Sequence, residues 1–466
     1  MDFIRSRFGA PVPKVLAWNA SSDNQVGCEY IIMEKCSGDV LETHLDHSPA
    51  ASQQHIFDVA RLYDNLASVP FSQYGSIYYK EDLDPSLQAR PLYADGVPTD
   101  ACAERFRIGP SVERRFYRGG RAHMSIDRGP CELFFKNPKK LFIEMGLGTN
   151  IHSYIKAAVD CEVKWLQSYT KTPSARKQLG AQHNAEQHIS VLKKWLLLAP
   201  AVIPSPEYCV PVLSHPDMHA GNIFVNRDDS MSLSGIIDWQ GAVVRPLFET
   251  DVPTFLLSSF SQDLRYEKLP DDDLPPPLFP DDYHELDVAC QKETLAAYKQ
   301  VESHHHFFKL ISQMQPKLYA VMLLRHMEDL RSAIYHSSHS WSLGLPRLEQ
   351  ALMSLATAYG DYIPVSTEYP VSPVIFSEKD MDRNKEEFCD IVLHDHLLEN
   401  HFLDMMKAKG FKMNPDGMVS MEDFEEAQEA ANEILEEAIE GMGEELVRRH
   451  WPVREGRLEP AMESCL

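Results

Sequence analysis

The feature that most constrains this sequence is a pair of short β-prone stretches between residues 211 and 251. The stretches Asn222 to Asn226 and Ser232 to Asp238 are joined by Arg227-Asp228-Asp229-Ser230, whose composition is typical of a hairpin turn. A polar loop precedes the first stretch and reads His215-Pro216-Asp217-Met218-His219-Ala220-Gly221-Asn222. We therefore expect a β-hairpin whose flanking loops bring polar side chains together.

Two carboxylates and one amide on these loops suit phosphoryl transfer. Transfer from ATP needs a carboxylate that orients the attacking hydroxyl and accepts its proton, together with oxygen ligands that hold Mg²⁺ against the phosphates. Asp217 is the candidate catalytic base, and Asn222 and Asp238 are the candidate Mg²⁺ ligands. The alternative is that these residues only form turns, because Asp and Asn are common in loops of every kind.

Two segments of this region resemble the catalytic and metal-binding loops of the aminoglycoside phosphotransferase family. The chain has HPDMHAGNIFV and then IIDWQ, where the family usually has wording close to HGDLHPGNILV and then a hydrophobic-Asp-Trp element. The resemblance implies that Asp217 is the catalytic base and that Asn222 and Asp238 bind Mg²⁺. It also implies that His215 and His219 shape the loop. Pro216 replaces a usual glycine.

Other segments extend the resemblance over roughly residues 1 to 360. The stretches PVPKVLAW and GCEYIIMEKCSG are similar to the family's passage into the hinge, where backbone groups near Met33, Glu34 and Lys35 would meet the adenine of ATP. Three further segments, at 106–110, 127–130 and 246–248, are similar to a fungal branch, the altered-inheritance-of-mitochondria phosphotransferase-like proteins. That branch implies a mitochondrial location. The chain shows no targeting segment, and a cytoplasmic location is expected otherwise.

The resemblance implies an α/β (α+β) protein of the kinase-like two-lobed fold, with a truncated N-lobe and a large helical C-lobe. Residues 1–40 would be the remnant of the N-lobe and the hinge. Residues 41–375 would form the helical C-lobe with the catalytic and metal-binding loops. Residues 376–466 would form an acidic helical tail, because glutamates are closely spaced there in a helix-prone pattern.

The elements that are expected to bind the triphosphate are missing from this sequence. In kinase-like folds a glycine-rich strand-turn-strand and a lysine on the third strand hold the triphosphate, and both precede the hinge. Only about thirty residues lie before Tyr30, and they contain no closely spaced glycines. Whether the chain is an enzyme therefore stays open. The alternative is a catalytically impaired pseudokinase that acts as a mitochondrial maintenance or binding protein. A third hypothesis is a metal hydrolase built on His215, Asp217, His219 and Asp238.

Charge and hydrophobicity narrow the class of partner. The formal net charge of −24 repels the backbone of nucleic acids, so we expect no nucleic-acid partner. The longest apolar stretch, Trp195 to Ile203, contains a proline and is shorter than the roughly 20 residues that cross a bilayer. We expect no membrane span. The expected partner is a small molecule, or another unknown acceptor, that carries a hydroxyl group.

Hydrophobic spacing and turn residues predict the remaining elements. The first eight residues should be a helix that stops at Gly9, and Val12 to Trp18 and Tyr30 to Lys35 should pair as a hairpin. Three consecutive histidines, 304–306, are expected at a solvated helix end. Seven arginines between residues 105 and 128 could attract an anionic partner or pair with the abundant carboxylates. Helices are expected at 51–68, 150–170, 186–198, 283–303, 306–336 and 347–359, with an insert at 80–147 and an exposed loop at 263–282.

Overall fold

The structure is a computed structural model, and it separates the chain into two compact units. The first unit comprises Met1–Phe116, Asp127–Ala157 and Pro204–Met327, and the second comprises Tyr117–Ile126, Ala158–Ile203 and Glu328–Leu466. The expected boundaries at residues 40 and 375 concern the lobes of a kinase-like fold, and they stay a prediction. The structure describes residues 1–45, 54–118, 120–132, 151–169, 184–228, 231–256, 283–324, 326–360, 369–411, 419, 423–444, 447–448 and 451.

The first unit begins with the helix and hairpin that the sequence predicts. Helix α1, Asp2–Phe8, ends where Gly9 adopts a left-handed conformation (φ 62°) and donates its amide hydrogen to the carbonyl of Arg5. Strand β1, Val15–Asn19, then pairs antiparallel with β2, Tyr30–Met33. Both strands are shorter than the predicted runs, and the pairing contains an irregularity between Val15 and Ala17.

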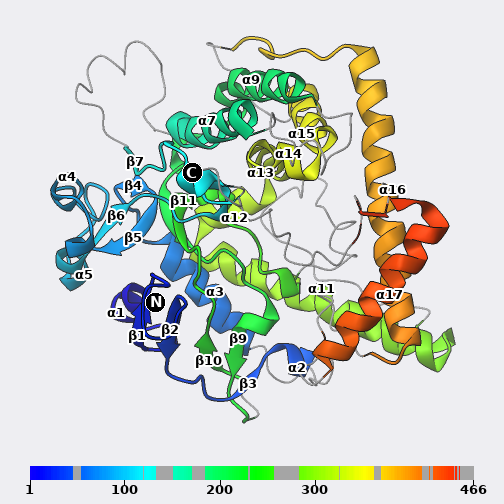
Figure 1. Cartoon of the computed structure of the whole chain (residues 1–466). Coiled ribbons are helices and arrows are strands. Elements are labelled where there is room, and N and C mark those ends of the chain that lie inside the picture. The colour runs from blue at the N-terminus through cyan, green and yellow to red at the C-terminus, as the bar shows by residue number, and fades with distance from the viewer. Residues whose placement is uncertain are drawn as a thin grey trace. The chain divides into compact units, whose positions relative to one another are not determined.

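The main helices of the first unit, α3, Gln54–Ala67, and α11, Val288–Met314, pack against each other through the apolar side chains that predicted them. Helix α3 buries the apolar stripe that predicted it. Its Tyr63 ring meets the ring of Phe307 edge to face at 5.6 Å, which joins α3 to α11. Figure 1 shows these two helices beside the hairpin of β9 and β10. Helix α12, Pro316–Leu323, contacts α11, and the short helix α2, Glu42–Leu45, contacts β3, Asp39–Val40.

The expected division of the chain near residue 304 is wrong. Helix α11 runs without interruption through the three histidines, and breaks occur instead at Gln315 and Leu324, which flank α12. His304 is buried, and its ring packs against the ring of Phe308 at 4.5 Å. Burial lowers the pKa of His304 to about 4, so the neutral ring serves as a core side chain. The histidines therefore do not mark a solvated helix end.

Short strands of the first unit frame the candidate site. Strand β8 pairs antiparallel with β11, and β5 pairs with β6. The predicted insert at 80–147 contributes the strands β6 and β7 and two short helices. The loop expected at 263–282 lies outside the described residues. The strands are β3, Asp39–Val40; β4, Gln73–Tyr74; β5, Ser76–Tyr79; β6, Phe106–Gly109; β7, Cys131–Glu132; β8, Pro211–Ser214; β9, Ile223–Val225; β10, Leu233–Ile236; and β11, Val243–Pro246, and the insert helices are α4, Pro85–Gln88, and α5, Ala101–Arg105.

The second unit is helical, and a buried ion pair ties its short leading segment to α7. Arg121 and Glu162 are almost completely buried, with 2.6 Å between Nη2 and Oε2. Glu162 also accepts a hydrogen bond from the hydroxyl of Ser340 at 3.2 Å, which satisfies its second oxygen. Helix α7, Ile151–Tyr169, begins in the first unit and belongs to the second from Ala158 onward. The other helices of the second unit are α9, Ala185–Val202; α13, Met327–Ser337; α14, Ser340–Leu343; α15, Leu345–Ala358; α16, Glu378–Ala408; and α17, Phe424–Met442.

Helices α16 and α17 pack against each other around a separate apolar cluster. Leu398, Phe402 and Met406 of α16 meet Ala427 and Ile434 of α17. The acidic side chains remain on the outside of α17, which gives this helix its amphipathic pattern. Both helices fall within the segment 376–466, for which the sequence predicts an acidic helical tail, and that domain assignment stays a prediction.

Three arginines of the insert are paired with carboxylates, whereas Arg107 and Arg118 donate to backbone carbonyl oxygens. Arg105 pairs with Asp2, and Arg115 lies 2.8 Å from Glu113. Together with the Arg121 pair, these contacts favour the structural alternative over an anion-binding role. Helices and small two- and three-stranded sheets together make a mixed α/β protein that is consistent with an α+β fold.

Candidate functional site

The candidate site lies on the loops of a small three-stranded sheet. Strands β9 and β10 form the predicted hairpin, and β3, from the segment after the predicted hinge, pairs with the other edge of β9 (Figure 1). Strand β8 is buried along its whole length and delivers His215 to the loop before β9. The sequence alternates little here because the strand is covered on both faces.

His215 connects the two loops that carry the candidate residues. Its Nδ1 accepts the amide hydrogen of Asp217 at 3.1 Å, while its Nε2 lies 2.9 Å from the carbonyl oxygen of Ile237. These two bonds require the neutral tautomer with hydrogen on Nε2. Burial lowers the pKa of His215, although the bond to Ile237 opposes this, so the neutral form is stabilised at physiological pH.

Asn222 joins the same loops through both its side chain and its main chain. Its Nδ2 donates to the carbonyl oxygen of Asp217 at 3.0 Å, and its own carbonyl accepts the amide hydrogen of Ile237 at 3.0 Å. The side chain is 6% exposed. Because Ile237 immediately precedes Asp238, these bonds place the candidate base, the candidate amide ligand and the candidate carboxylate ligand on directly connected segments.

The two candidate carboxylates remain accessible to solvent. The side chain of Asp217 is 60% exposed, and Asp238 is also exposed. His219 lies 3.8 Å from Asp217, measured between Nε2 and Oδ2, and its Nδ1 accepts the amide hydrogen of Gly221 at 3.1 Å. The loop therefore buries its organising groups and exposes its acids, which is the arrangement that a reaction with a diffusible substrate needs.

Asp238 holds an unusual backbone conformation. Its φ angle is 56°, in the left-handed region that residues with a Cβ rarely adopt. The adjacent Trp239 is buried, donates its indole hydrogen to the carbonyl of Ile236 at 3.1 Å, and packs against the ring of His215 at 4.6 Å. These contacts hold the turn, and strained backbone of this kind is concentrated at functional sites.

The three expected adenine contacts lie at the end of β2. The amide of Glu34 donates to the carbonyl of Lys14 at 2.9 Å, so this backbone group is already engaged. The Glu34 carboxylate accepts the amide hydrogen of Lys14 at 3.1 Å and lies 3.6 Å from Arg5. Met33 and Lys35 flank this bonded residue, and both are exposed.

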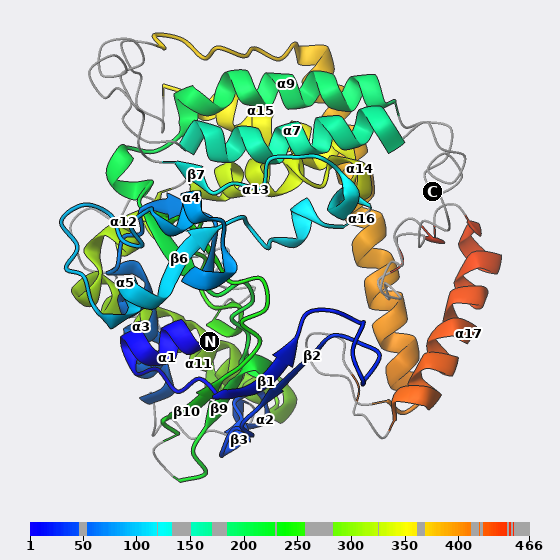
Figure 2. The same cartoon turned by 60° about the vertical axis from the view of Figure 1, so that its left-hand side comes forward.

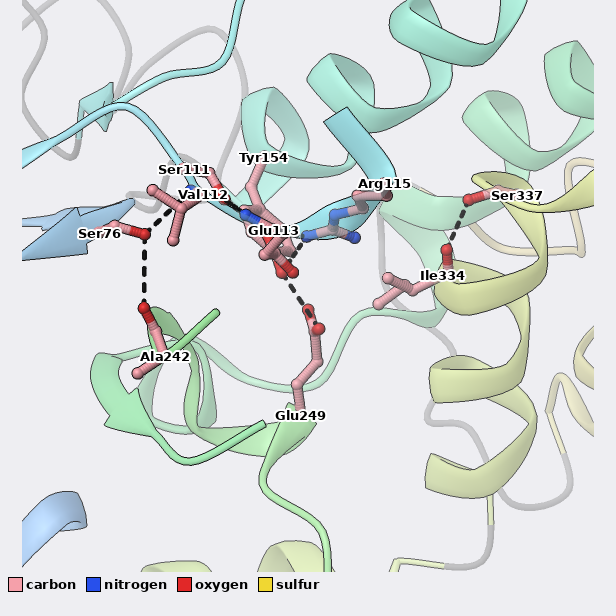
Figure 3. A network of polar contacts seen from close by, with 10 residues as sticks. All are labelled: Ser76, Ser111, Val112, Glu113, Arg115, Tyr154, Ala242, Glu249, Ile334 and Ser337. Carbon is pink, nitrogen blue, oxygen red and sulfur yellow. Dashed lines mark hydrogen bonds and ion pairs between the residues drawn. The ribbon is translucent and has the colours of Figure 1, made fainter. Parts of the chain in front are cut away.

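A buried polar network around Tyr154 was not predicted from the sequence. Arg115 contacts Glu113 at 2.8 Å and the hydroxyl of Tyr154 at 2.6 Å, and that hydroxyl donates to Glu249 at 3.1 Å (Figure 3). Burial raises the pKa of Glu249 to about 7, against the opposing effect of Arg115 and Arg245. The only local signal was a glutamate three residues beyond the end of the buried strand β11, and its partners are distant in sequence.

Two further contacts hold the segments that flank the candidate loops. Arg245 of β11 donates to the hydroxyl of Ser214 at 2.7 Å, immediately before His215. Buried Asp58 of α3 accepts the amide hydrogen of Leu233 at 2.9 Å, where β10 begins. Both contacts join segments far apart in sequence, and no local pattern indicated them.

The hypothesis of a metal hydrolase is not supported. No group of three or more His, Cys, Asp and Glu side chains that could hold a metal ion occurs within the described residues. The physical reason is visible at His215, whose two ring nitrogens both take part in loop hydrogen bonds. Asn222 and Asp238 offer oxygen donors only, which suit Mg²⁺ rather than a transition metal.

Comparison with known proteins points to one enzyme family and to fungal relatives. A subtelomeric hrmA-associated cluster protein of Aspergillus fumigatus is 26% identical over 98% of this chain and 88% of its own length. Two relatives are named altered inheritance of mitochondria protein 9, mitochondrial. The one from Candida tropicalis is 22% identical to this chain, and the one from Saccharomyces cerevisiae is 23% identical to it. Each alignment with these two covers 86% of this chain and 63% or 64% of the relative.

Over the described residues, none of the helices combines the length and the apolar character needed to cross a bilayer.

The family match falls on residues 154–250, which include β8, the candidate catalytic loop and the turn at Asp238. The resemblance that the two sequence motifs indicated is thus confirmed, since residues 154–250 of this chain match the phosphotransferase enzyme family.

Proposed function

We propose that this protein transfers a phosphoryl group from ATP, with Mg²⁺, to a hydroxyl group of a small-molecule acceptor. The observation that carries this proposal is a pair of hydrogen bonds at Asn222, whose amide nitrogen donates to the carbonyl of Asp217 and whose own carbonyl accepts the amide hydrogen of Ile237. This set connects the candidate base and both candidate metal ligands. The match to a phosphotransferase family supports transfer chemistry over the alternative of a pseudokinase.

In this proposal Asp217 acts on the acceptor. Its exposed carboxylate can accept a hydrogen bond from the acceptor hydroxyl and then take its proton as the phosphoryl group arrives. His215 fixes the direction of the Asp217 backbone through the amide bond at 3.1 Å. His219 stands beside the same carboxylate and limits its movement.

Asn222 and Asp238 would hold the magnesium ion. Asn222 uses its amide nitrogen in the bond to Asp217, which leaves the amide oxygen as a metal donor. Asp238 contributes a negatively charged oxygen from an exposed position. Magnesium, when bound, would neutralise charge on the nucleotide phosphates. Both donors are oxygens, in keeping with the preference of a hard cation.

The nucleotide base would meet the backbone of Met33 and Lys35, with Glu34 holding the segment in place. Because the Glu34 amide is bonded to Lys14, its carboxylate and amide brace the hinge and do not face the base. The names of the relatives support a mitochondrial location for this protein.

Nucleotide binding and transfer can be tested separately. In a thermal-shift assay, Mg·ATP should raise the melting temperature of the wild-type chain. The Asp238→Ala variant should show no such increase. Asp217→Asn should keep the increase but lose the slow transfer of the phosphoryl group to water, which releases ADP and phosphate, because this carboxylate acts on the attacking oxygen. Asp95→Asn, an exposed aspartate on a remote loop, is the matched control and should behave as wild type.

The outcomes distinguish the alternatives. An increase in melting temperature without any ATP turnover in the wild-type chain would favour the pseudokinase. No increase with Mg·ATP at saturating concentration would contradict the nucleotide-binding proposal itself.

A further inference from the structure

Arg245 of β11 lies beside the start of the candidate catalytic loop, residues 215–222. Strand β11 pairs antiparallel with β8, and in this register Arg245 lies opposite Val212. Ser214 is two residues further along β8, on the same face as Val212. A long side chain reaches such a diagonal neighbour, and Arg245 Nη2 donates to Ser214 Oγ at 2.7 Å. The last residue of β8 is therefore held by the side chain of the neighbouring strand.

The hydroxyl of Ser214 connects this contact to the loop. Its oxygen accepts the hydrogen bond from Arg245, and its own hydrogen is donated to the carbonyl of His215 at 3.3 Å. Ser214 and His215 are 5% and 6% exposed, so water competes little for these groups. The ring of His215 in turn accepts the amide hydrogen of Asp217. A chain of contacts thus leads from the guanidinium to the backbone of the candidate base.

The charge of Arg245 has no carboxylate partner within the described ranges. The side chain is partly buried, its Nε is buried without a hydrogen-bond partner there, and its side-chain hydrogen bond goes to Ser214. Glu249 is near enough for Arg245 to oppose the rise of its pKa, but these two described side chains form no ion pair. A partly buried cation without an ion pair reduces stability, and such a loss is expected mainly at functional sites.

The two candidate metal ligands are held by a different set of contacts. Asn222 directly precedes β9, and its carbonyl accepts the amide hydrogen of Ile237. Strands β9 and β10 pair with each other, and Figure 2 shows them together with β3, which pairs with the other edge of β9. Because Asp238 follows Ile237, the hairpin itself holds both ligands. Loss of the Arg245 contact should therefore displace Asp217 and leave the metal ligands in place.

We propose that Arg245 is a positioning residue for phosphoryl transfer, which acts through Ser214 to hold the candidate catalytic loop where the Asp217 carboxylate meets the acceptor hydroxyl. This inference rests on the proposed function and adds a residue outside the two sequence motifs. Arg245 acts through other side chains and does not touch the reacting atoms. Its removal should therefore slow the transfer step and leave the binding of Mg·ATP unchanged.

Two substitutions break the contact from either side. Arg245→Met removes the guanidinium and keeps a long side chain, and Ser214→Ala removes the hydroxyl that accepts its hydrogen bond. In steady-state ATP turnover each variant should lower kcat by roughly 10- to 100-fold, since small displacements of a reacting group have effects of this size. KM for Mg·ATP should change by less than about twofold. The double variant should lose no more activity than the more affected single variant, because both substitutions remove the same contact.

Arg107→Met is the matched control. Arg107 is a partly buried arginine on β6, and its guanidinium donates to the backbone carbonyls of Gln88, Ala103 and Phe106. These contacts hold the insert and not the candidate loops. The variant should therefore melt at a lower temperature than the wild type and keep the kcat of the wild type. Circular dichroism of each variant establishes that the chains are folded, and Ser214→Ala carries the test if Arg245→Met does not fold.

Hydrogen exchange tests the loop itself, whether or not ATP is turned over. The amide hydrogen of Asp217 is bonded to the ring of His215. In Arg245→Met, mass spectrometry of peptides that cover residues 213–221 should show exchange at least about tenfold faster than in the wild type, because a hydrogen bond to a charged group is lost. Peptides from β9 and β10 should exchange as in the wild type, and Arg107→Met should leave exchange in the loop unchanged.

The outcomes separate a failure of this inference from a failure of the proposed function. Unchanged exchange in the loop of Arg245→Met, a wild-type kcat in that variant, additive losses in the double variant, or an equal loss of kcat in Arg107→Met would each overturn the role of Arg245. A wild-type chain that turns over no ATP would instead contradict the proposed function, and the positioning role would fall with it.

Discussion

Replacing Glu249 by glutamine should change how the stability of the protein depends on pH. Glu249 is buried beside Tyr154, and burial raises its pKa from 4.5 to about 7. A group whose pKa is higher in the folded state binds a proton more tightly there. Its contribution to stability is complete below pH 4.5 and is lost as the pH rises through about 7. The glutamine side chain keeps the shape and remains neutral.

The magnitude follows from the two pKa values. Their difference, at about 1.4 kcal/mol for each pH unit, corresponds to about 3 kcal/mol of unfolding free energy that the wild type loses between pH 4.5 and about 7. The glutamine variant should not show this loss. The difference in unfolding free energy, variant minus wild type, should therefore rise by up to about 3 kcal/mol across this window and stay constant at higher pH.

Urea denaturation at pH 5, 6, 7 and 8 measures this difference, because contributions from all other groups cancel between the two proteins. Glu104→Gln, at an exposed position on α5, is the matched control and should give a difference that is independent of pH. If the Glu249→Gln difference is equally flat between pH 5 and 8, the carboxyl group titrates normally. The inference from its burial and from the bonds in Figure 3 would then be wrong.

Three further substitutions probe other parts of the structure. His215→Leu removes bonds at 2.9 and 3.1 Å and should cost about 2–4 kcal/mol in urea denaturation, whereas His284→Leu at an exposed site should change stability by under about 0.5 kcal/mol. Arg121→Met should cost about 3–5 kcal/mol because it leaves Glu162 buried without its cation, and adding Glu162→Gln should recover part of the loss. Asp238→Gly should raise the melting temperature while abolishing stabilisation by Mg·ATP, since glycine adopts the left-handed conformation without strain.

Much of the candidate site could be predicted because its contacts are close in sequence. His215 bonds to residues 2 and 22 positions away, and Asn222 bonds to a carbonyl 5 positions away. A hairpin with a fixed turn determines such short-range geometry, so the motif spacing contains it. The helix at the N-terminus and the β1–β2 hairpin were predictable for the same reason, since Gly9 and the turn residues act locally.

The rest of the framework depends on contacts that no local pattern encodes. Tyr154 and Glu249 are 95 residues apart, and Asp58 and Leu233 are 175 residues apart. The misplaced break at residue 304 has a related cause. Consecutive histidines are typical of an exposed position, but His304 is buried against the ring of Phe308 as a neutral side chain. Tertiary burial there overrides the local preference.

Asp238 is the position where folding and the proposed chemistry make opposite demands. Its left-handed backbone favours glycine on conformational grounds, and an aspartate there costs stability that buried neighbours such as Trp239 must offset. A residue selected for the turn alone has no need of a carboxylate. The carboxylate is exposed, follows the residue that His215 and Asn222 both bond, and supplies the charged donor that a magnesium ion requires. The strain is therefore best explained by what the Asp238 side chain binds. On that explanation alone, Asp238→Gly should make the protein more stable and at the same time abolish its binding of Mg·ATP.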